Sequence, residues 1–208
     1  TLTTVGYGDM SPAGPVGKLL TILLFFLSVI IFSFMMTNIQ TVVAERQRLK
    51  ALGMNGTKFQ NHVVVCSFSS ISTVAIKELL AAGRQIAVIV EDANSIPLVQ
   101  ELGTSQNLFV TVGDPTSEEA LHRVNITQAN TVVAASEDDT LNLIVALEMK
   151  RLNPNARIVV STKRAELRST LTSSGVTYVA SPFELSGRLV ASAAFEPEVA
   201  RFVDDVTS

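Results

Sequence analysis

The sequence predicts an α/β protein in which one membrane-spanning helix is followed by a Rossmann-like, doubly wound parallel sheet. Two observations carry this fold class. The 208 residues are 47% hydrophobic with a mean hydropathy of +0.36, which is high for a soluble domain and indicates a membrane segment. After Lys58, short β-branched runs alternate with amphipathic helical stretches joined by a few turn residues, which is the pattern of βαβ units.

The apolar excess lies in residues 19–44, which contain no charged side chain. At about 1.5 Å rise per residue, a helix of this length exceeds the ~30 Å hydrocarbon core of a bilayer. The long apolar run, with no small-residue cleavage pattern after it, disfavours a signal peptide. Basic residues favour the C-terminal side of the run, so we expect that side in the cytoplasm. Lys18 precedes the run, and Arg46, Arg48, Lys50 and Lys58 follow it.

Candidate strands and helices alternate through the rest of the chain. Strands this apolar must be covered on both faces, so the sheet should be parallel with right-handed crossovers. Gly83, Gly103 and Gly175 each follow a helical run, where a left-handed C-cap is expected. The expected strands are 62–66, 85–90, 108–112, 131–135, 157–161 and 177–180, and the expected helices include 72–82, 95–102, 118–124, 138–152 and 165–173.

Charge and cysteine content exclude several classes of function. The net charge of -3 and the pI near 5.4 argue against nucleic-acid partners, because neutralising phosphates needs a basic surface. Cys66 is the single cysteine, which excludes an intramolecular disulfide framework. With His62 and His122 as the two histidines, the sequence offers no Cys/His zinc site.

The first expected strand ends where a doubly wound fold would hold a dinucleotide, in a Gly-x-Gly-x-x-Gly turn. Serines hold the three glycine places: Ser67, Ser69 and Ser72. Glu91 ends the second strand at about the spacing of a ribose-binding carboxylate, and Asp92 follows it. This pattern indicates a degenerate nucleotide site at a helix N-terminus. The alternative is that the serines cap the helix and that Glu91 and Asp92 begin a solvated loop.

Ahead of the membrane segment, residues 4–9 read TVGYGD. This stretch resembles the selectivity filter of potassium channels, in which the carbonyl oxygens of four such loops replace the hydration shell of K⁺. Glycine accepts positive φ without a Cβ clash, so Gly6 and Gly8 let successive carbonyls face one axis. One loop supplies a quarter of the ligands, which implies a tetramer. The expected K⁺ ligands are in Thr4, Val5, Gly6 and Tyr7, and Gly8 completes the filter.

Nearly the whole chain resembles two-transmembrane prokaryotic potassium channels with a cytoplasmic RCK (TrkA-N-like) domain. The resemblance rests on TVGYGD at 4–9, HVVVCSFS at 62–69, VGDPT at 112–116 and SPFELSGRL at 181–189. Gly113 and Asp114 of the third motif join the expected nucleotide contacts. The resemblance implies four parts: a pore domain fragment with the filter and the pore-lining inner helix (1–44), a linker (45–60), the RCK N-terminal Rossmann-like lobe (61–183), and crossover and interface helices (184–208).

The resemblance also implies an assembly. We expect a homotetramer in the cell membrane, with membrane lipid around the inner helix and with RCK domains that assemble through the helices after Phe183. Such subunits normally begin with an outer helix and continue into a C-terminal lobe, so we expect a fragment that does not conduct alone. Relatives often bend the inner helix at a glycine. Ser28 lies in that region here and can bond back to the preceding turn or face a neighbouring helix.

Calcium-gated relatives bind the ion through carboxylates after the fourth strand and at the end of the fifth. The matching positions here are Ala135, Ser161 and Lys163, and Lys163 would repel a cation. Glu137 and Asp138 stand close by as alternative calcium ligands. Their other interpretation, shared with Asp139, is favourable charge at the N-terminus of the next helix.

The sequence therefore predicts a potassium-selective channel subunit, not an enzyme, gated by NAD(H), ATP/ADP or Ca²⁺ bound to the RCK domain. One alternative is a regulatory TrkA-like nucleotide-binding subunit of a potassium transport system. The filter argues against it, because a pure regulator needs no pore. A membrane-tethered dehydrogenase is disfavoured, because neither a glycine-rich dinucleotide loop nor a second, catalytic domain is visible.

Overall fold

The computed structural model describes residues 14–195. By its internal contacts the chain divides into two units, residues 1–51 and 52–208, and each is described by itself. The first unit contains helix α1 (Pro15–Ala51), and the second contains an α/β lobe.

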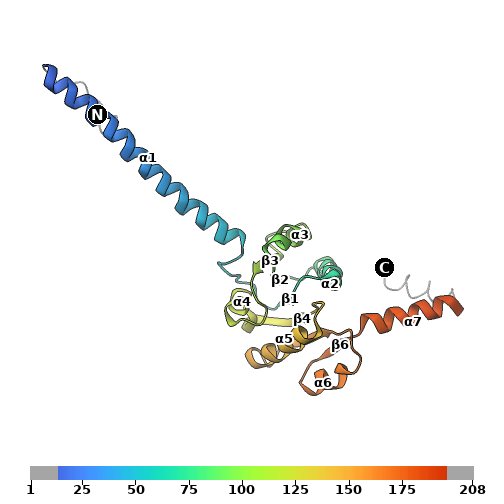
Figure 1. The fold of residues 1–208 in the computed structure, drawn as a ribbon. Coiled ribbons are helices and arrows are strands. Elements are labelled where there is room, and N and C mark those ends of the chain that lie inside the picture. Colours follow the sequence, from blue (N-terminus) through green and yellow to red (C-terminus); the bar gives the residue numbers. More distant parts are fainter. Residues whose placement is uncertain (1–13, 196–208) are drawn as a thin grey trace. The chain divides into compact units, whose positions relative to one another are not determined.

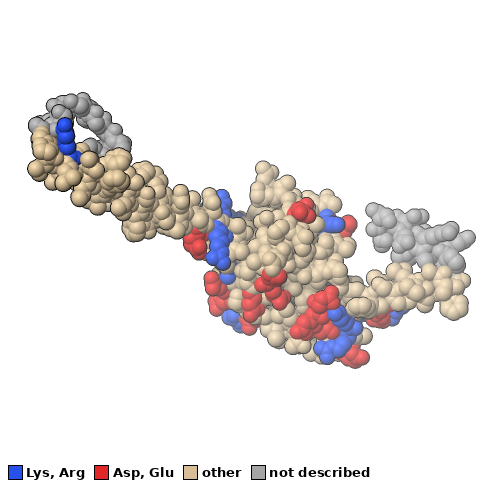
Figure 2. Space-filling view, turned by 45° about the horizontal axis from the view of Figure 1, so that its top comes forward, with Lys and Arg blue, Asp and Glu red and all other residues tan. Residues whose placement is uncertain are grey.

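Helix α1 has 37 residues, and its large apolar side chains are exposed along its whole length. Within residues 14–195 it is the one helix long and apolar enough to cross a membrane, by length and composition. Figure 2 shows charged residues near the two ends of this helix and none along its middle. Ser28 Oγ donates to Phe25 O at 2.7 Å, so this hydroxyl bonds back to the preceding turn.

The lobe is built on a six-stranded parallel sheet with the order β3-β2-β1-β4-β5-β6. The order reverses between β1 and β4, which is the topological switch point of a doubly wound fold. The strands are β1 (His62–Cys66), β2 (Ile86–Val90), β3 (Leu108–Val112), β4 (Ala129–Ala134), β5 (Arg157–Ser161) and β6 (Tyr178–Ala180). The helices are α2 (Ser70–Ala81), η1 (Ala93–Ser95), α3 (Ile96–Gln100), α4 (Glu118–Arg123), η2 (Ile126–Gln128), α5 (Asp139–Leu152), α6 (Leu167–Ser173) and α7 (Pro182–Phe195).

Helices cover both faces of the sheet (Figure 1). Successive residues of a strand point to opposite faces, so β1 supplies two cores: Val63 and Val65 belong to one, and Val64 and Cys66 to the other. The first core also takes Ile76 of α2 and Ile96 and Val99 of α3, and the second takes Leu121 of α4, Met149 of α5 and Leu171 of α6.

The predicted fold class is confirmed by the parallel sheet and its covering helices. The bounds of β1, β3 and β5 agree with the expected strands. Gly83 and Gly175 have φ of 72° and 86°, as left-handed caps require, but the same expectation for Gly103 is wrong. A Cβ on Gly103 would lie 3.0 Å from the Leu108 side chain and 3.1 Å from that of Leu80, so close packing explains this glycine.

His62 is buried at the start of β1, and its ring Nε2 lies 2.8 Å from Val124 O. A carbonyl only accepts, so Nε2 carries the proton, and Nδ1 is then a buried nitrogen without a partner among the described residues. Burial lowers the pKa of His62, because a charged ring would lose its hydration, and this outweighs the bond to Val124.

Acidification should therefore destabilise the lobe through His62. Below pH 6.5, the ordinary pKa of histidine, His62 is protonated in the unfolded chain but still neutral in the folded lobe. The free energy of unfolding therefore falls as the pH drops from 6.5 toward the lower pKa of the folded state. Urea unfolding of the full chain in detergent, followed by far-UV circular dichroism between about pH 7.5 and about pH 5.5, measures this slope. His62→Gln should flatten it. The same change at His122, whose side chain is 65% exposed, should not; an unaltered slope in His62→Gln would contradict the assignment.

Candidate functional site

A hollow of about 340 Å³ lies at the carboxyl ends of β1, β2 and β4, beside the switch point of the sheet. Open α/β sheets bind their ligands at this place. We call it the crevice. It contains three of the seven residues predicted for a nucleotide: Ser67, Glu91 and Asp92. The full lining is Ser67, Phe68, Glu91, Asp92, Ser95, Ser136, Glu137, Asp138 and Leu141.

Ser67 and Glu91 meet in the crevice. Ser67 holds the first glycine place of the motif and has φ of 78°, in the left-handed region that favours glycine. Its Oγ donates to Glu91 Oε1 at 3.2 Å, which links the ends of β1 and β2. The neighbouring Asp92 caps η1 by accepting from Asn94 N at 3.0 Å. A carboxylate accepts several hydrogen bonds, so Glu91 keeps capacity for a hydroxyl of a ligand.

Ser69 and Ser72 do not line the crevice but form a capping box at the start of α2. Ser69 Oγ accepts from Ser72 N at 3.2 Å, and Ser72 Oγ accepts from Ser69 N at 2.6 Å. Ser69 Oγ also donates to Ala135 O, which joins this turn to the end of β4. Two of the backbone donors that a helix N-terminus can offer to an anion are therefore satisfied within the chain.

Gly113 and Asp114 follow β3 and also lie outside the crevice lining. A Cβ on Gly113 would come within 2.8 Å of the Cβ of Ala120, so this glycine allows α4 to approach the sheet. Asp114 accepts from the hydroxyl and the backbone N of Thr116 at 2.6 and 2.8 Å. These bonds lower the pKa of Asp114 and shape the turn before α4.

The acidic residues at the start of α5 are engaged with partners of their own. Glu137 forms an ion pair with Lys163, and Asp138 caps α5 by accepting from Thr140 N at 2.8 Å. Burial would raise the pKa of Asp139, but bonds from Lys163 and Arg164 outweigh it and lower that pKa. Within residues 14–195 no group of three or more His, Cys, Asp or Glu side chains is arranged to hold a metal. The prediction that Glu137 and Asp138 bind calcium stays a prediction.

Sequence reasoning missed Phe68, Ser95, Ser136 and Leu141 as lining residues of the crevice. Ser136 follows β4, which is far from β1 in sequence but adjacent to it in the sheet. Knowledge of the strand order would have identified it, because the polar residue after each neighbouring strand meets the same edge. The predicted filter residues, Thr4 to Gly8, lie outside the described residues, as does the part of the predicted crossover and interface helices after residue 195.

The segment 52–61, which we call the connector, lies on the lobe rather than free of it. The residues expected as a linker, 45–60, thus divide between the end of α1 and this docked segment. Val112 N donates to Leu52 O at 3.1 Å, along the open edge of β3. Further along, Thr57 N donates to Arg123 O at 2.8 Å, and Asn61 N donates to Gln128 O at 2.9 Å.

Arg123 at the end of α4 holds the connector at its centre. Its Nη1 donates to Val112 O at 2.8 Å and to Thr111 Oγ1 at 3.3 Å, and it also contacts the sulfur of Met54. The side chain is 12% exposed, and its ion pair with Glu119 is at the surface. One partly buried guanidinium therefore joins β3, α4 and the connector.

Comparisons with protein families agree with this architecture. The TrkA-N domain family model matches residues 63–182, more than half of the chain and almost the whole sheet. The chain belongs to the TrkA-N domain family. An ion channel family model matches residues 1–45, which contain the predicted filter and most of α1. The TrkA-N lobe is thus joined on one chain to a channel-type membrane segment.

Several curated relatives of this TrkA-N chain are potassium channels. It is 27% identical to potassium channel protein 1 of Methanocaldococcus jannaschii, over 100% of this chain and 63% of the relative. It is 25% identical to the calcium-gated potassium channel TvoK of Thermoplasma volcanium, over 98% of this chain and 60% of the relative. A solved structure of the GsuK channel bound to NAD shares the fold, with a TM-score of 0.60 and 19% identity over 90% of this chain and 34% of that one. The chain therefore spans less than two thirds of each relative.

The connector should depend on Gly53. With φ of 71° and a Cβ that would lie 2.1 Å from Val110 O, Gly53→Ala combines backbone strain with overlap. Gly83 is a matched control, because its φ is 72° and nothing lies within 4 Å of its Cβ position. We expect Gly83→Ala to lower the free energy of unfolding of the lobe by about 1 kcal/mol. Gly53→Ala should lower the free energy of unfolding by about 2 kcal/mol more than Gly83→Ala does, or should detach the connector from the lobe.

Urea unfolding measures the loss of stability in both variants. Hydrogen exchange of residues 52–57 measures release, as faster exchange in Gly53→Ala than in Gly83→Ala. If the two variants match in both measurements, the connector is not docked as described.

Proposed function

We propose that this chain is part of a potassium channel whose opening is controlled by a ligand bound to the TrkA-N lobe. The observation that carries the proposal is the joint match: a channel family over residues 1–45 and the TrkA-N family over residues 63–182 lie on one chain, and a curated potassium channel aligns with all of it. A purely regulatory subunit, the alternative function, would not need the channel segment.

In this proposal K⁺ is the transported ion. Backbone carbonyls of Thr4, Val5, Gly6 and Tyr7 are its ligands, and four copies of the chain surround the axis. In the same proposal α1 crosses the membrane in contact with lipid, and the basic residues near its C-terminal end favour a cytoplasmic location for the lobe. α7 offers Phe183, Val190 and Phe195 as exposed apolar side chains for assembly of the lobes.

The crevice favours an adenine nucleotide with a free ribose diol as the gating ligand. Glu91 ends β2, where Rossmann-like folds place a carboxylate on the ribose hydroxyls, and it already accepts from Ser67. Four carboxylates and no Lys or Arg line the crevice, so an additional 2′-phosphate would meet like charge. NAD(H), ADP and ATP have a free ribose diol and no 2′-phosphate, so they fit these conditions better than NADP(H). The NAD bound to the GsuK channel supports the ligand class.

Calcium is the second candidate, because TvoK is described as calcium-gated. The chemistry of Glu137 and Asp138 supports it less well. Glu137 faces Lys163, and Asp138 is engaged as the cap of α5. A calcium ion prefers six to eight oxygen ligands, several of them charged and free to coordinate.

A ligand shifts channel opening only by the difference of its affinities for the closed and open states. The docked connector could link the ligand-binding lobe to α1. Residue 52 follows the last residue of α1 directly, and the connector is bonded to β3 and α4 through Leu52 and Arg123. A displacement of β3 or α4 on ligand binding would therefore move Leu52, the residue that directly follows α1.

Glu91→Gln should weaken NAD and ADP binding by about tenfold, because a charged acceptor of ribose hydroxyls is replaced by a neutral amide. Isothermal titration calorimetry of the full chain in detergent measures this. Glu101→Gln is the matched control, since Glu101 is exposed and lies outside the crevice lining. NADP should bind more weakly than NAD to the parent protein.

Equal affinities for NAD and NADP, or no change in Glu91→Gln, would contradict the nucleotide assignment. Calcium binding in the absence of nucleotide, removed by Glu137→Gln, would favour the calcium alternative instead.

Gly6→Ala should abolish the preference for K⁺ over Na⁺, because a methyl group at a position of positive φ would turn the filter carbonyls away from the ion. The measurement is cation flux into liposomes that contain the full-length protein. Gly83→Ala, in the lobe, is the control and should retain selective flux. Selective K⁺ flux in Gly6→Ala would refute the filter, and ligand binding without any flux would favour the regulatory subunit.

A further inference from the structure

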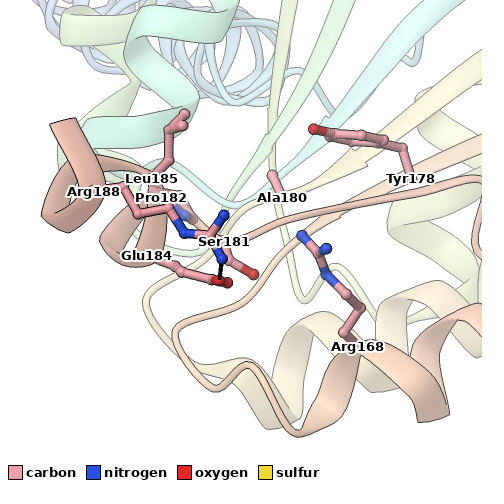
Figure 3. Close-up of a pocket in the computed structure, with 8 residues that line it drawn as sticks. All are labelled: Arg168, Tyr178, Ala180, Ser181, Pro182, Glu184, Leu185 and Arg188. Atoms are coloured by element: carbon pink, nitrogen blue, oxygen red, sulfur yellow. Dashed lines mark hydrogen bonds and ion pairs between the residues drawn. The ribbon is translucent and has the colours of Figure 1, made fainter. Parts of the chain in front are cut away.

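A second hollow, of about 270 Å³, lies between β6, α6 and the start of α7. Its volume is just below the range of about 300–1,000 Å³ usual for small-molecule sites. It shares no lining residue with the crevice. Its walls combine apolar groups with two arginines, as Figure 3 shows: Arg168, Tyr178, Ala180, Pro182, Leu185 and Arg188.

The two arginines come from different helices and approach the hollow from two sides (Figure 3). Arg168 of α6 donates from Nη2 to Val179 O at 3.2 Å and forms no ion pair within residues 14–195. Arg188 of α7 pairs with Glu184, but both side chains of this pair are exposed, at 77% and 41%. Exposed pairs of this kind are weak and exchange readily. The hollow therefore carries an excess of positive charge.

Ser181 adds an unsatisfied hydroxyl. Its Oγ is buried and has no hydrogen-bond partner among the described residues, although Ser181 directly precedes α7 and could have capped it. Buried polar atoms without partners are rare and call for an explanation. Ser181 lines the hollow, and Figure 3 places it beside the Arg188–Glu184 pair.

We propose that this hollow is an oxyanion site that binds a phosphate group, free or carried by a small molecule. Arg168 and Arg188 hold the phosphate oxygens from two sides, and Ser181 donates its hydroxyl. Planar guanidinium groups match the geometry of phosphate oxygens, and two of them from different elements fix its position. Glu184 competes with the phosphate for Arg188. The site is independent of the proposed nucleotide crevice, which has the opposite charge.

The test is calorimetric titration of the full chain in detergent with inorganic phosphate and, separately, with glycerol 3-phosphate. Chloride and glycerol are the control ligands. Arg168→Gln and Arg188→Gln should each weaken phosphate binding by about tenfold or more, because each removes a charge-assisted hydrogen bond. Arg151→Gln is the control, since Arg151 is an exposed, ion-paired arginine on α5 away from the hollow. Tighter binding of glycerol 3-phosphate than of inorganic phosphate would identify a phosphate ester as the ligand.

Two further variants keep the proposal falsifiable if an arginine variant fails to fold. Glu184→Gln should strengthen phosphate binding by about threefold, because it removes a competitor. Ser181→Ala should leave the melting temperature of the free protein unchanged or higher, because its hydroxyl has no partner to lose, and should reduce the increase in melting temperature caused by phosphate.

Phosphate binding that is unchanged in Arg168→Gln, or weakened in Glu184→Gln, would overturn the proposal. Absence of phosphate binding, together with loss of self-association in Arg168→Gln, would also overturn it and would assign the arginines to a carboxylate of a second copy.

Discussion

All six strands of the lobe run in one direction, and this constraint decides where its chemistry can lie. A parallel sheet is apolar on both faces and needs helices on both, so polar side chains collect where the strands end. Ser67 after β1, Glu91 after β2 and Ser136 after β4 meet for this reason. The same constraint leaves the outer edge of β3 open, and the connector occupies part of it.

The strands and the residues at their ends could be predicted from the sequence, because both depend on local patterns. Runs of β-branched residues predicted the strands. The spacing of Ser67 and Glu91 assigned both residues to one site, and in the structure they are hydrogen-bonded. Spacing could not separate a phosphate-binding turn from a capping box, and Ser69 with Ser72 forms the latter. Gly103 shows the same limit. A glycine is needed there because the Leu108 side chain packs against it, not because the position follows a helix. Ser136 required the strand order, which no local pattern contains.

The crevice and the hollow beside α7 differ in the sign of their charge. The crevice is lined by carboxylates, whereas the hollow beside α7 is lined by two arginines and one glutamate. A ligand with both a sugar and a phosphate would be drawn to each for a different part of its structure.

The bond from Val112 N to Leu52 O also limits what can pair with the outer edge of the sheet. An uncovered outer strand is a template on which another polypeptide can add itself, and β3 is such a strand. The end of β3 is already bonded to the chain's own backbone at Leu52, and β6 at the opposite edge of the sheet is only three residues long. Neither edge therefore offers a long hydrogen-bond ladder to a neighbouring chain. A second copy could then contact the lobe through side chains but not through a long backbone ladder, which protects the folded lobe from aggregation.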